Sequence, residues 1–218
     1  MTPRGPCGPS SSSPTRRRRR RPELIWAALV AVAGAACATA HLPGPGVAES
    51  AAAASSWSGS ARVSVKGRDV RGRSRVLLAF RRPDAMRIEI PGPAGARLVA
   101  VLRDGRLTAV LPAERAYLES AASAADLDAL LGVGLAPQEL MDVLVGKAPA
   151  GVRDYEAQWG GALPKRVFAV LADGTRLDAR VDEAEKDVEL PEAAFDPPPH
   201  PGYRPVDADE ARRLLGGR

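Results

Sequence analysis

Few side chains in this sequence are suited to covalent or metal chemistry. The 218 residues include two cysteines, Cys7 and Cys37, and two histidines, His41 and His200. A catalytic triad or a metal site normally takes at least one histidine from a rigid element. Here one histidine follows a signal-like segment and the other stands in a run of prolines. We therefore expect no catalytic residues, no metal and no cofactor, in a protein that is not an enzyme.

Other reactive patterns are equally weak. Acidic pairs such as Asp126/Asp128 and Asp182/Glu183 fall at expected helix starts and turns, where capping or solvated roles are common. Gly132-Val133-Gly134 lacks the spacing and the lysine of a phosphate-binding loop. Aromatic residues make up 4% of the chain, which disfavours nucleic-acid stacking. An enzyme on envelope glycans is the minor alternative, and it would need a buried carboxylate pair.

Cys37 stands at the end of an export signal. Six arginines, Arg16 to Arg21, precede the apolar run Leu24–Ala36, which is too short to span a bilayer core of about 30 Å. Gly34-Ala35-Ala36-Cys37 resembles a bacterial lipobox, with glycine where leucine is usual. The resemblance implies removal of residues 1–36 and attachment of fatty acids such as palmitate to Cys37. Cleavage after the A-x-A sequence Ala38–Ala40 is the alternative.

The lipobox also bears on location and charge. By resemblance to the bacterial sorting rule, Ala38 after the cysteine implies the periplasmic face of the outer membrane in a Gram-negative bacterium. Residues 1–36 hold seven of the 31 basic and one of the 26 acidic residues, so the remainder has 24 basic and 25 acidic ones. The basic pI therefore belongs to the leader and gives no support for nucleic-acid binding.

Composition divides the rest of the chain into three parts. Residues 37–56 are rich in Pro, Gly, Ala and Ser and predict a flexible tether. Residues 57–195 are long enough for one domain with its own core. Residues 196–218 form a Pro-rich C-terminal tail, which is expected to end in a short helix over Ala208–Leu215.

Period-2 alternation of apolar and polar residues predicts strands on both sides of a helical middle. Asp104-Gly105 and Asp173-Gly174 are hairpin signals. The expected strands are Ala61–Lys66, Arg75–Arg81, Met86–Ile90, Arg97–Leu102, Leu107–Leu111, Tyr155–Trp159, Lys165–Leu171, Arg176–Val181 and Asp187–Leu190. The expected helices are Ala124–Leu131, capped by Ser123, and a second from Pro137 to Val145. This order favours an α+β domain in which one antiparallel sheet curls around an apolar interior.

Several short motifs resemble the outer-membrane lipoprotein receptor family LolB. They are Trp57-Ser58-Gly59 at the first strand, the strand and loop Ile88–Gly95, and the helical stretch from Leu135-Ala136-Pro137 to Leu144-Val145-Gly146. Their order and spacing cover roughly residues 56–190. The resemblance implies an incomplete antiparallel β-barrel with a helical lid over a hydrophobic cavity. It also implies a monomer that accepts lipoprotein acyl chains from a soluble periplasmic carrier of the LolA type.

Strand parity selects the residues expected to face such a cavity, because alternate side chains share one face of a sheet. They are Val63, Val65, Leu78, Phe80, Met86, Ile88, Ile90, Leu98 and Leu102.

The resemblance makes Pro93, Ala94 and Gly95 a membrane-facing loop. Receptors of the family carry an exposed leucine in this loop, and Ala94 stands there instead, so another envelope lipoprotein of this fold, binding a different lipid or acting as a scaffold, is the alternative. The arginines between Arg62 and Arg106 could meet anionic headgroups or an acidic carrier. Simple solvation of strand faces explains them equally well.

Overall fold

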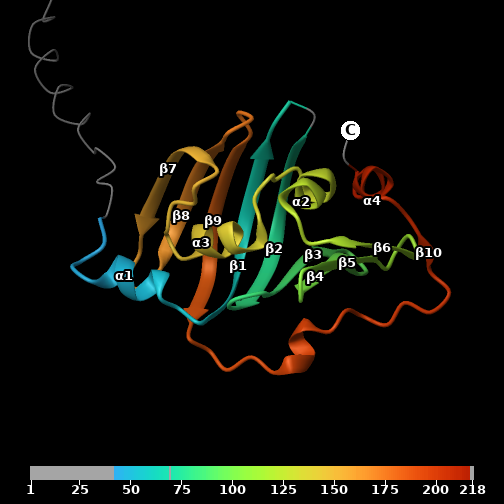
Figure 1. Ribbon diagram of the computed structural model, residues 1–218, viewed down its shortest axis with the longest axis horizontal. Coiled ribbons are helices and arrows are strands. Elements are labelled where there is room, and N and C mark those ends of the chain that lie inside the picture. The colour runs from blue at the N-terminus through green and yellow to red at the C-terminus, as the bar shows by residue number, and fades with distance from the viewer. Residues whose placement is uncertain (1–41, 69, 217–218) are drawn as a thin grey trace, which may run out of the picture. The chain divides into compact units, whose positions relative to one another are not determined.

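Alternating apolar and polar residues form ten strands in the computed structural model, which describes residues 42–68 and 70–216. The first six strands are β1 (Ser56–Lys66), β2 (Arg71–Arg81), β3 (Ala85–Gly92), β4 (Gly95–Arg103), β5 (Arg106–Leu111) and β6 (Ala116–Ala121). The other four are β7 (Val152–Trp159), β8 (Pro164–Leu171), β9 (Arg176–Lys186) and β10 (Arg204–Pro205). Figure 1 shows them as one strongly curved, unclosed sheet.

The strand order is β10-β6-β5-β4-β3-β2-β1-β9-β8-β7. Neighbouring strands are antiparallel except β10, which runs parallel to β6. β1 lies at the junction of the two halves of the chain, because it pairs with β2 on one side and with β9 on the other. Asp104 and Gly105 turn β4 into β5 with φ of 51° and 72°, as an Asp-Gly hairpin requires.

Two helices lie across one face of the sheet (Figure 1). They are α2 (Ala124–Leu131) and α3 (Pro137–Leu144), and the predicted cap of α2 is present, since Ser123 Oγ accepts a hydrogen bond from the Asp126 N–H at 3.1 Å. Gly132 ends α2 with φ of 72°, and a Cβ there would meet Val70 at 2.5 Å. Among the described residues, no helix is both long and apolar enough to cross a membrane.

The segments on either side of the sheet are more structured than the sequence predicts. Within the expected tether, α1 (Val47–Ala52) forms, and Ala51 and Ala54 are buried in the core. The tail contributes β10 and α4 (Ala208–Leu214), close to the predicted helix. Before it comes the short 3₁₀ turn η1 (Glu192–Phe195), whose Phe195 is fully buried. These contacts are not predicted from the sequence, because the alanines and prolines of these segments give no periodic apolar signal.

Two strand predictions need correction. The sequence predicts a turn over Asp182–Lys186, between the expected strands Arg176–Val181 and Asp187–Leu190. In the structure β9 continues to Lys186, so this segment is strand, and Asp187–Leu190 is not. The acidic end of β9 pairs with the start of β1, across a bulge at Ser60/Ala61 that absorbs one extra residue. The sequence also did not predict β6 as a strand, because one of its buried residues is the small Ala116.

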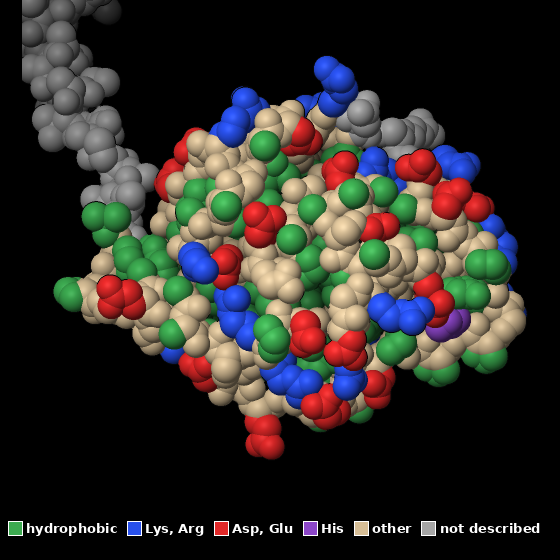
Figure 2. All heavy atoms as spheres, in the orientation of Figure 1, with side chains coloured by type: hydrophobic (Ala, Val, Ile, Leu, Met, Phe, Trp, Pro, Cys, Tyr) green, Lys and Arg blue, Asp and Glu red, His purple; other side chains and the backbone are tan. Residues whose placement is uncertain are grey.

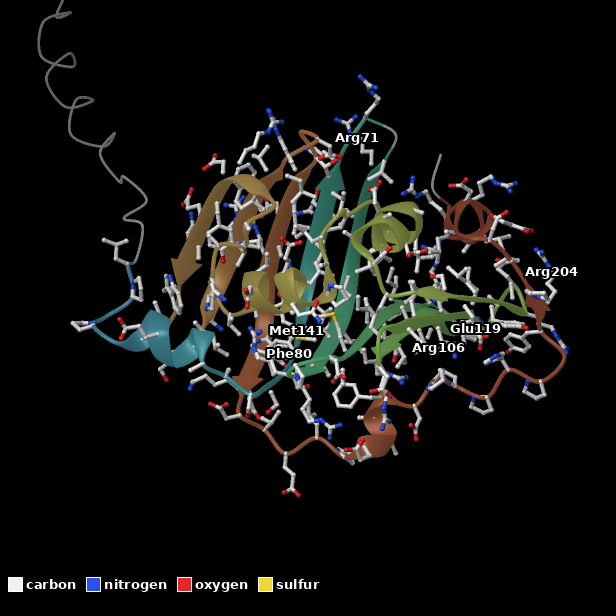
Figure 3. The ribbon with its side chains drawn as sticks, in the orientation of Figure 1. Arg71, Phe80, Arg106, Glu119, Met141 and Arg204 are labelled. Atoms are coloured by element: carbon white, nitrogen blue, oxygen red, sulfur yellow. The ribbon has the colours of Figure 1, made fainter. Side chains whose placement is uncertain are left out.

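The side chains of the sheet and helices form two contiguous cores. In the larger core, Trp57 and Phe80 stack with ring centroids 6.2 Å apart, and Phe80 and Met141 of α3 are both buried (Figure 3). The smaller core lies around β8 and includes Val167 and Leu135.

Candidate functional site

A cavity of about 230 Å³ lies between strands β9, β1, β2 and β3 and the helices that cover them. Its wall is mostly aliphatic. The sheet contributes Val63, Val65, Val76, Leu78, Met86, Ile88, Ile90, Leu177 and Ala179. The helices and their connections contribute Val70, Leu130, Leu131, Val133, Leu140, Val143, Leu144 and Leu215.

The structure divides the nine sequence-predicted cavity residues into two groups. Six line this cavity: Val63, Val65, Leu78, Met86, Ile88 and Ile90. Phe80, Leu98 and Leu102 belong to the closed core instead, with 0%, 0% and 1% of their surfaces exposed. Strand parity identifies the inner face of a sheet, but it does not distinguish the covered part of that face from the open part.

Sequence reasoning missed the residues that the helices and β9 add to the wall. The apolar stripe of α3 was visible as Leu140, Leu144 and their neighbours, and it marked the buried face of the helix. Nothing in that stripe says which strand it faces. The contribution of Leu177 and Ala179 depends on the pairing of β9 with β1, which joins residues far apart in the chain.

Polar contacts hold α3 over the sheet. Asp142 of this helix accepts a hydrogen bond from Arg82 at 2.7 Å and pairs with Lys147 at 2.9 Å. The Tyr155 hydroxyl of β7 donates to the Val143 carbonyl oxygen at 3.3 Å. Burial, together with the nearby Asp142 charge, raises the pKa of Tyr155 well above its ordinary value. The tyrosine is therefore a neutral donor at physiological pH, and it fixes α3 next to the cavity.

The polar members of the cavity wall are Ser74 and three arginines, Arg71, Arg97 and Arg212. Arg71 lies near the end of the β1–β2 hairpin (Figure 3), Arg97 near the start of β4, and Arg212 on α4. Arg97 Nη2 donates to the Leu215 carbonyl oxygen at 2.5 Å, and Arg212 Nη2 donates to the carbonyl oxygen of Asp128 in α2. These bonds attach the C-terminal helix to the rim of the cavity.

The expected membrane-facing loop is an exposed turn between β3 and β4. Pro93, Ala94 and Gly95 are all exposed, and Gly95 has φ of 114°. The Arg97 side chain passes over Gly92 at the base of this turn, since a Cβ at that glycine would meet Arg97 Cγ at 2.5 Å. The turn therefore lies beside the arginine that contributes to the cavity wall.

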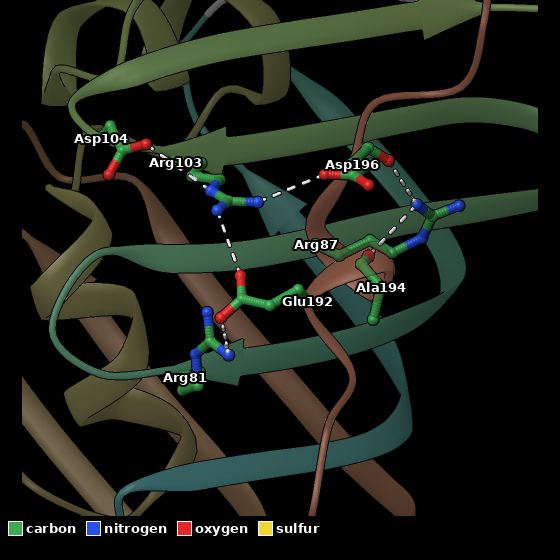
Figure 4. A network of polar contacts seen from close by, with 7 residues as sticks. All are labelled: Arg81, Arg87, Arg103, Asp104, Glu192, Ala194 and Asp196. Carbon is green, nitrogen blue, oxygen red and sulfur yellow. Dashed lines mark hydrogen bonds and ion pairs between the residues drawn. The ribbon is translucent and has the colours of Figure 1, made fainter.

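Other arginines of the sheet are paired with the C-terminal segment. Glu192 of η1 bridges Arg81 at 2.8 Å and Arg103 at 3.1 Å, and Arg103 also contacts Asp196 at 3.2 Å (Figure 4). The Arg81 hydrogen bond is the main reason that the pKa of Glu192 lies below its ordinary value. On the face with α2 and α3, basic and acidic side chains are interspersed (Figure 2). Some of the arginines between Arg62 and Arg106 are thus paired with acidic side chains within the fold.

The residues considered for covalent or metal chemistry do not come together in a site within the described residues. Cys37 and His41 lie outside the described residues. His200 packs on Tyr117 of β6, with ring centroids 4.5 Å apart. Across residues 42–68 and 70–216, no group of three or more His, Cys, Asp or Glu side chains is placed to hold a metal ion.

Comparisons with known proteins give only distant likenesses. No protein-family model and no curated protein matches the sequence. A LolA superfamily protein from Nitrosomonas europaea superposes with a TM-score of 0.43 at 12% identity, over 70% of this chain and 96% of its own. An uncharacterised conserved protein from Thermus thermophilus superposes with a TM-score of 0.43 at 14% identity, over 73% and 96%.

A third solved structure is a proposed outer membrane lipoprotein-sorting protein domain from Vibrio parahaemolyticus. It superposes with a TM-score of 0.36 at 8% identity, over 65% of this chain and 89% of its own. With all three TM-scores below 0.5, neither a family nor a function follows from these likenesses.

Proposed function

We propose that this protein is a lipid-anchored envelope protein that binds acyl chains in the cavity between its curved sheet and its helices. In this proposal Cys37 carries the anchor, the outer membrane holds the protein at its periplasmic face, and the chain works as a monomer without a cofactor. Its task is LolB-like, namely to accept lipoproteins from a carrier of the LolA type and to insert them into the membrane.

The observation that carries this proposal is the aliphatic cavity itself. The inner face of a curved sheet is normally covered by packed side chains, whereas here a pocket of about 230 Å³, lined mostly by aliphatic side chains, is open to solvent at its rim. An apolar cavity of about 150 Å³ in another protein is enough to bind benzene. Each methylene moved from water into such a site contributes about 0.8 kcal/mol, so a short stretch of acyl chain would bind measurably.

The size of the cavity favours a second candidate, a same-fold lipoprotein that binds a different lipid. Pockets that enclose a drug-sized ligand typically measure about 300–1,000 Å³. A volume of about 230 Å³ suits a segment of one acyl chain better than the several chains of a lipoprotein anchor. In the LolB-like task, α2 and α3 would have to move away from the sheet to admit more than one chain. A purely scaffolding role would leave the cavity without a use.

Mass spectrometry of lipids that co-purify with the full-length chain tests both candidates. The protein is extracted with a detergent that has no alkyl chain of lipid length, and the bound lipids are identified. A Val63→Phe variant, which places a ring in the cavity, serves as the matched control for surface-bound lipid. Lipoprotein fragments bound to the wild type alone support the LolB-like task, and a single-chain lipid supports the second candidate. Equal lipid content in both proteins refutes binding in the cavity.

A further inference from the structure

We infer that the cavity takes a single acyl chain joined to its own anionic headgroup, which Arg71, Arg97 and Arg212 bind at the mouth. This inference rests on the proposed binding of acyl chains and names the class of ligand. The ligand would be a fatty acid or a single-chain lipid that ends in a phosphate monoester, since a carboxylate and a phosphate monoester share the required chemistry.

The first observation is the position of the mouth. β2 and β3 pair from Leu77↔Glu89 to Arg81↔Ala85, and in the described strands the earlier part of β2 pairs with β1 alone. The cavity wall includes residues on both sides of this divergence, such as Ser74 of β2 and Ile90 of β3. Arg71 and Arg97 are exposed, whereas most of the aliphatic wall is buried. The arginines therefore lie where the apolar interior meets water.

The second observation is that the charge at this mouth has one sign. The residues that line the cavity include three arginines and no aspartate or glutamate. The hydrogen bonds of Arg97 and Arg212 go to backbone carbonyl oxygens, which leave the positive charge uncompensated. Within the described part of the chain, none of the three pairs with an acidic side chain, unlike Arg81 and Arg103 on the same sheet. The Nε of Arg212 is buried and has no hydrogen-bond partner among the described atoms.

Chemistry and geometry then point to the same ligand. A guanidinium group presents a rigid fork of donors that matches a carboxylate or a phosphate and stays charged at every physiological pH. The hydrocarbon stem of an arginine packs on apolar surface while its head remains in water. An amphiphile with an anionic head and one apolar chain fits both parts of the site, and a neutral apolar molecule fits only one.

Binding of matched amphiphiles to the full-length chain tests the inference. Dodecanoate, dodecyl phosphate and dodecanol share one chain length, and inorganic phosphate provides the headgroup chemistry without a chain. We expect both anionic amphiphiles to bind at least roughly tenfold more tightly than dodecanol, a difference of about 1.4 kcal/mol. This preference should shrink as salt rises from about 0.1 M to about 1 M, because the Debye length falls from about 10 Å to about 3 Å.

Two triple variants separate a headgroup site from general surface charge. In R71Q/R97Q/R212Q the preference for the anionic amphiphiles should disappear while dodecanol binding persists. R73Q/R106Q/R213Q removes the same charge from exposed arginines of β2, β5 and α4 that lie outside the cavity wall, and it should retain the preference. Because Arg97 and Arg212 also attach α4, the single variant R71Q is measured as well, and it should lose part of the preference.

The remaining outcomes test the headgroup inference and the proposed binding of acyl chains separately. Equal affinity of wild type for dodecanoate and dodecanol would overturn the headgroup inference and leave acyl binding intact. Binding of none of the three amphiphiles would overturn the proposed function itself. Binding of inorganic phosphate as tight as that of dodecyl phosphate would show a plain anion site, and would also overturn the inference.

Discussion

Replacing Val63 by phenylalanine should fill part of the cavity at little cost in stability. Val63 lies on β1 opposite Ser74 of β2 and Ala179 of β9, and all three line the cavity. Because Val63 faces the cavity and both its cross-strand neighbours are small, a phenyl ring has open space in front of it. A ring that enters this space buries apolar surface, and each Å² buried contributes about 25 cal/mol to the free energy of unfolding. We therefore expect the free energy of unfolding to stay unchanged or to rise by up to about 1–2 kcal/mol.

The matched control is Val167→Phe. Val167 is 1% exposed, lies opposite the small residues Ala157 and Ala179, and is absent from the cavity wall. Added volume at a packed position costs about 1–3 kcal/mol. At about 2–4 °C of Tm per kcal/mol for a domain of this size, that variant should melt about 2–12 °C lower.

Thermal and urea unfolding of both variants, with dodecanoate binding measured in parallel, provide the assay. Val63→Phe should keep its Tm and lose ligand affinity, whereas Val167→Phe should lose Tm and keep affinity at low temperature. An equal loss of stability in the two variants would refute the reasoning, because it would mean that the space in front of Val63 is closed in solution.

Three further predictions concern the core, the charges and the anchor. Phe80→Ala should lower the free energy of unfolding by about 3–5 kcal/mol in urea titrations without abolishing ligand binding, because Phe80 stacks on Trp57 outside the cavity; a small loss would mean a loosely packed core. Two Arg166 hydrogen bonds, at 2.9 and 2.7 Å, lower the pKa of Asp178, so its stabilisation is present above the ordinary pKa of 3.8 and lost as pH falls through the lowered value. Asp178→Asn should therefore be less stable at neutral pH and show a flatter acid-unfolding profile, and an unchanged profile would contradict this. Cys37→Ser should release the protein from the membrane fraction, and continued processing with detergent-sensitive co-sedimentation would refute the lipobox interpretation.

Local patterns were sufficient for most of the secondary structure. Alternation located β1 to β5, and Ser123 and Gly132 bounded α2 at the predicted residues. Both Asp-Gly pairs lie in hairpins, and at Asp104-Gly105 both residues have the positive φ that such a turn favours. These signals succeed because each depends on residues within about one turn or one strand of one another. Because these signals are local, they did not predict that Asp182–Lys186 is a strand. Its strand conformation depends on pairing with β1, which lies far away in the chain.

Local patterns predict a curved antiparallel sheet with an apolar inner face and nine candidate cavity residues, of which six line the pocket and three lie in the closed core. Which part of that face stays open and which part is closed depends on which helix covers which strand, and this follows from the packing of distant segments. The tertiary structure also gives the arginines different surroundings. Arg81 and Arg103 meet Glu192 more than eighty residues away, whereas Arg71, Arg97 and Arg212 converge on the cavity from β2, β4 and α4. All are equally basic in the sequence, and their different surroundings arise from long-range packing that no local pattern encodes.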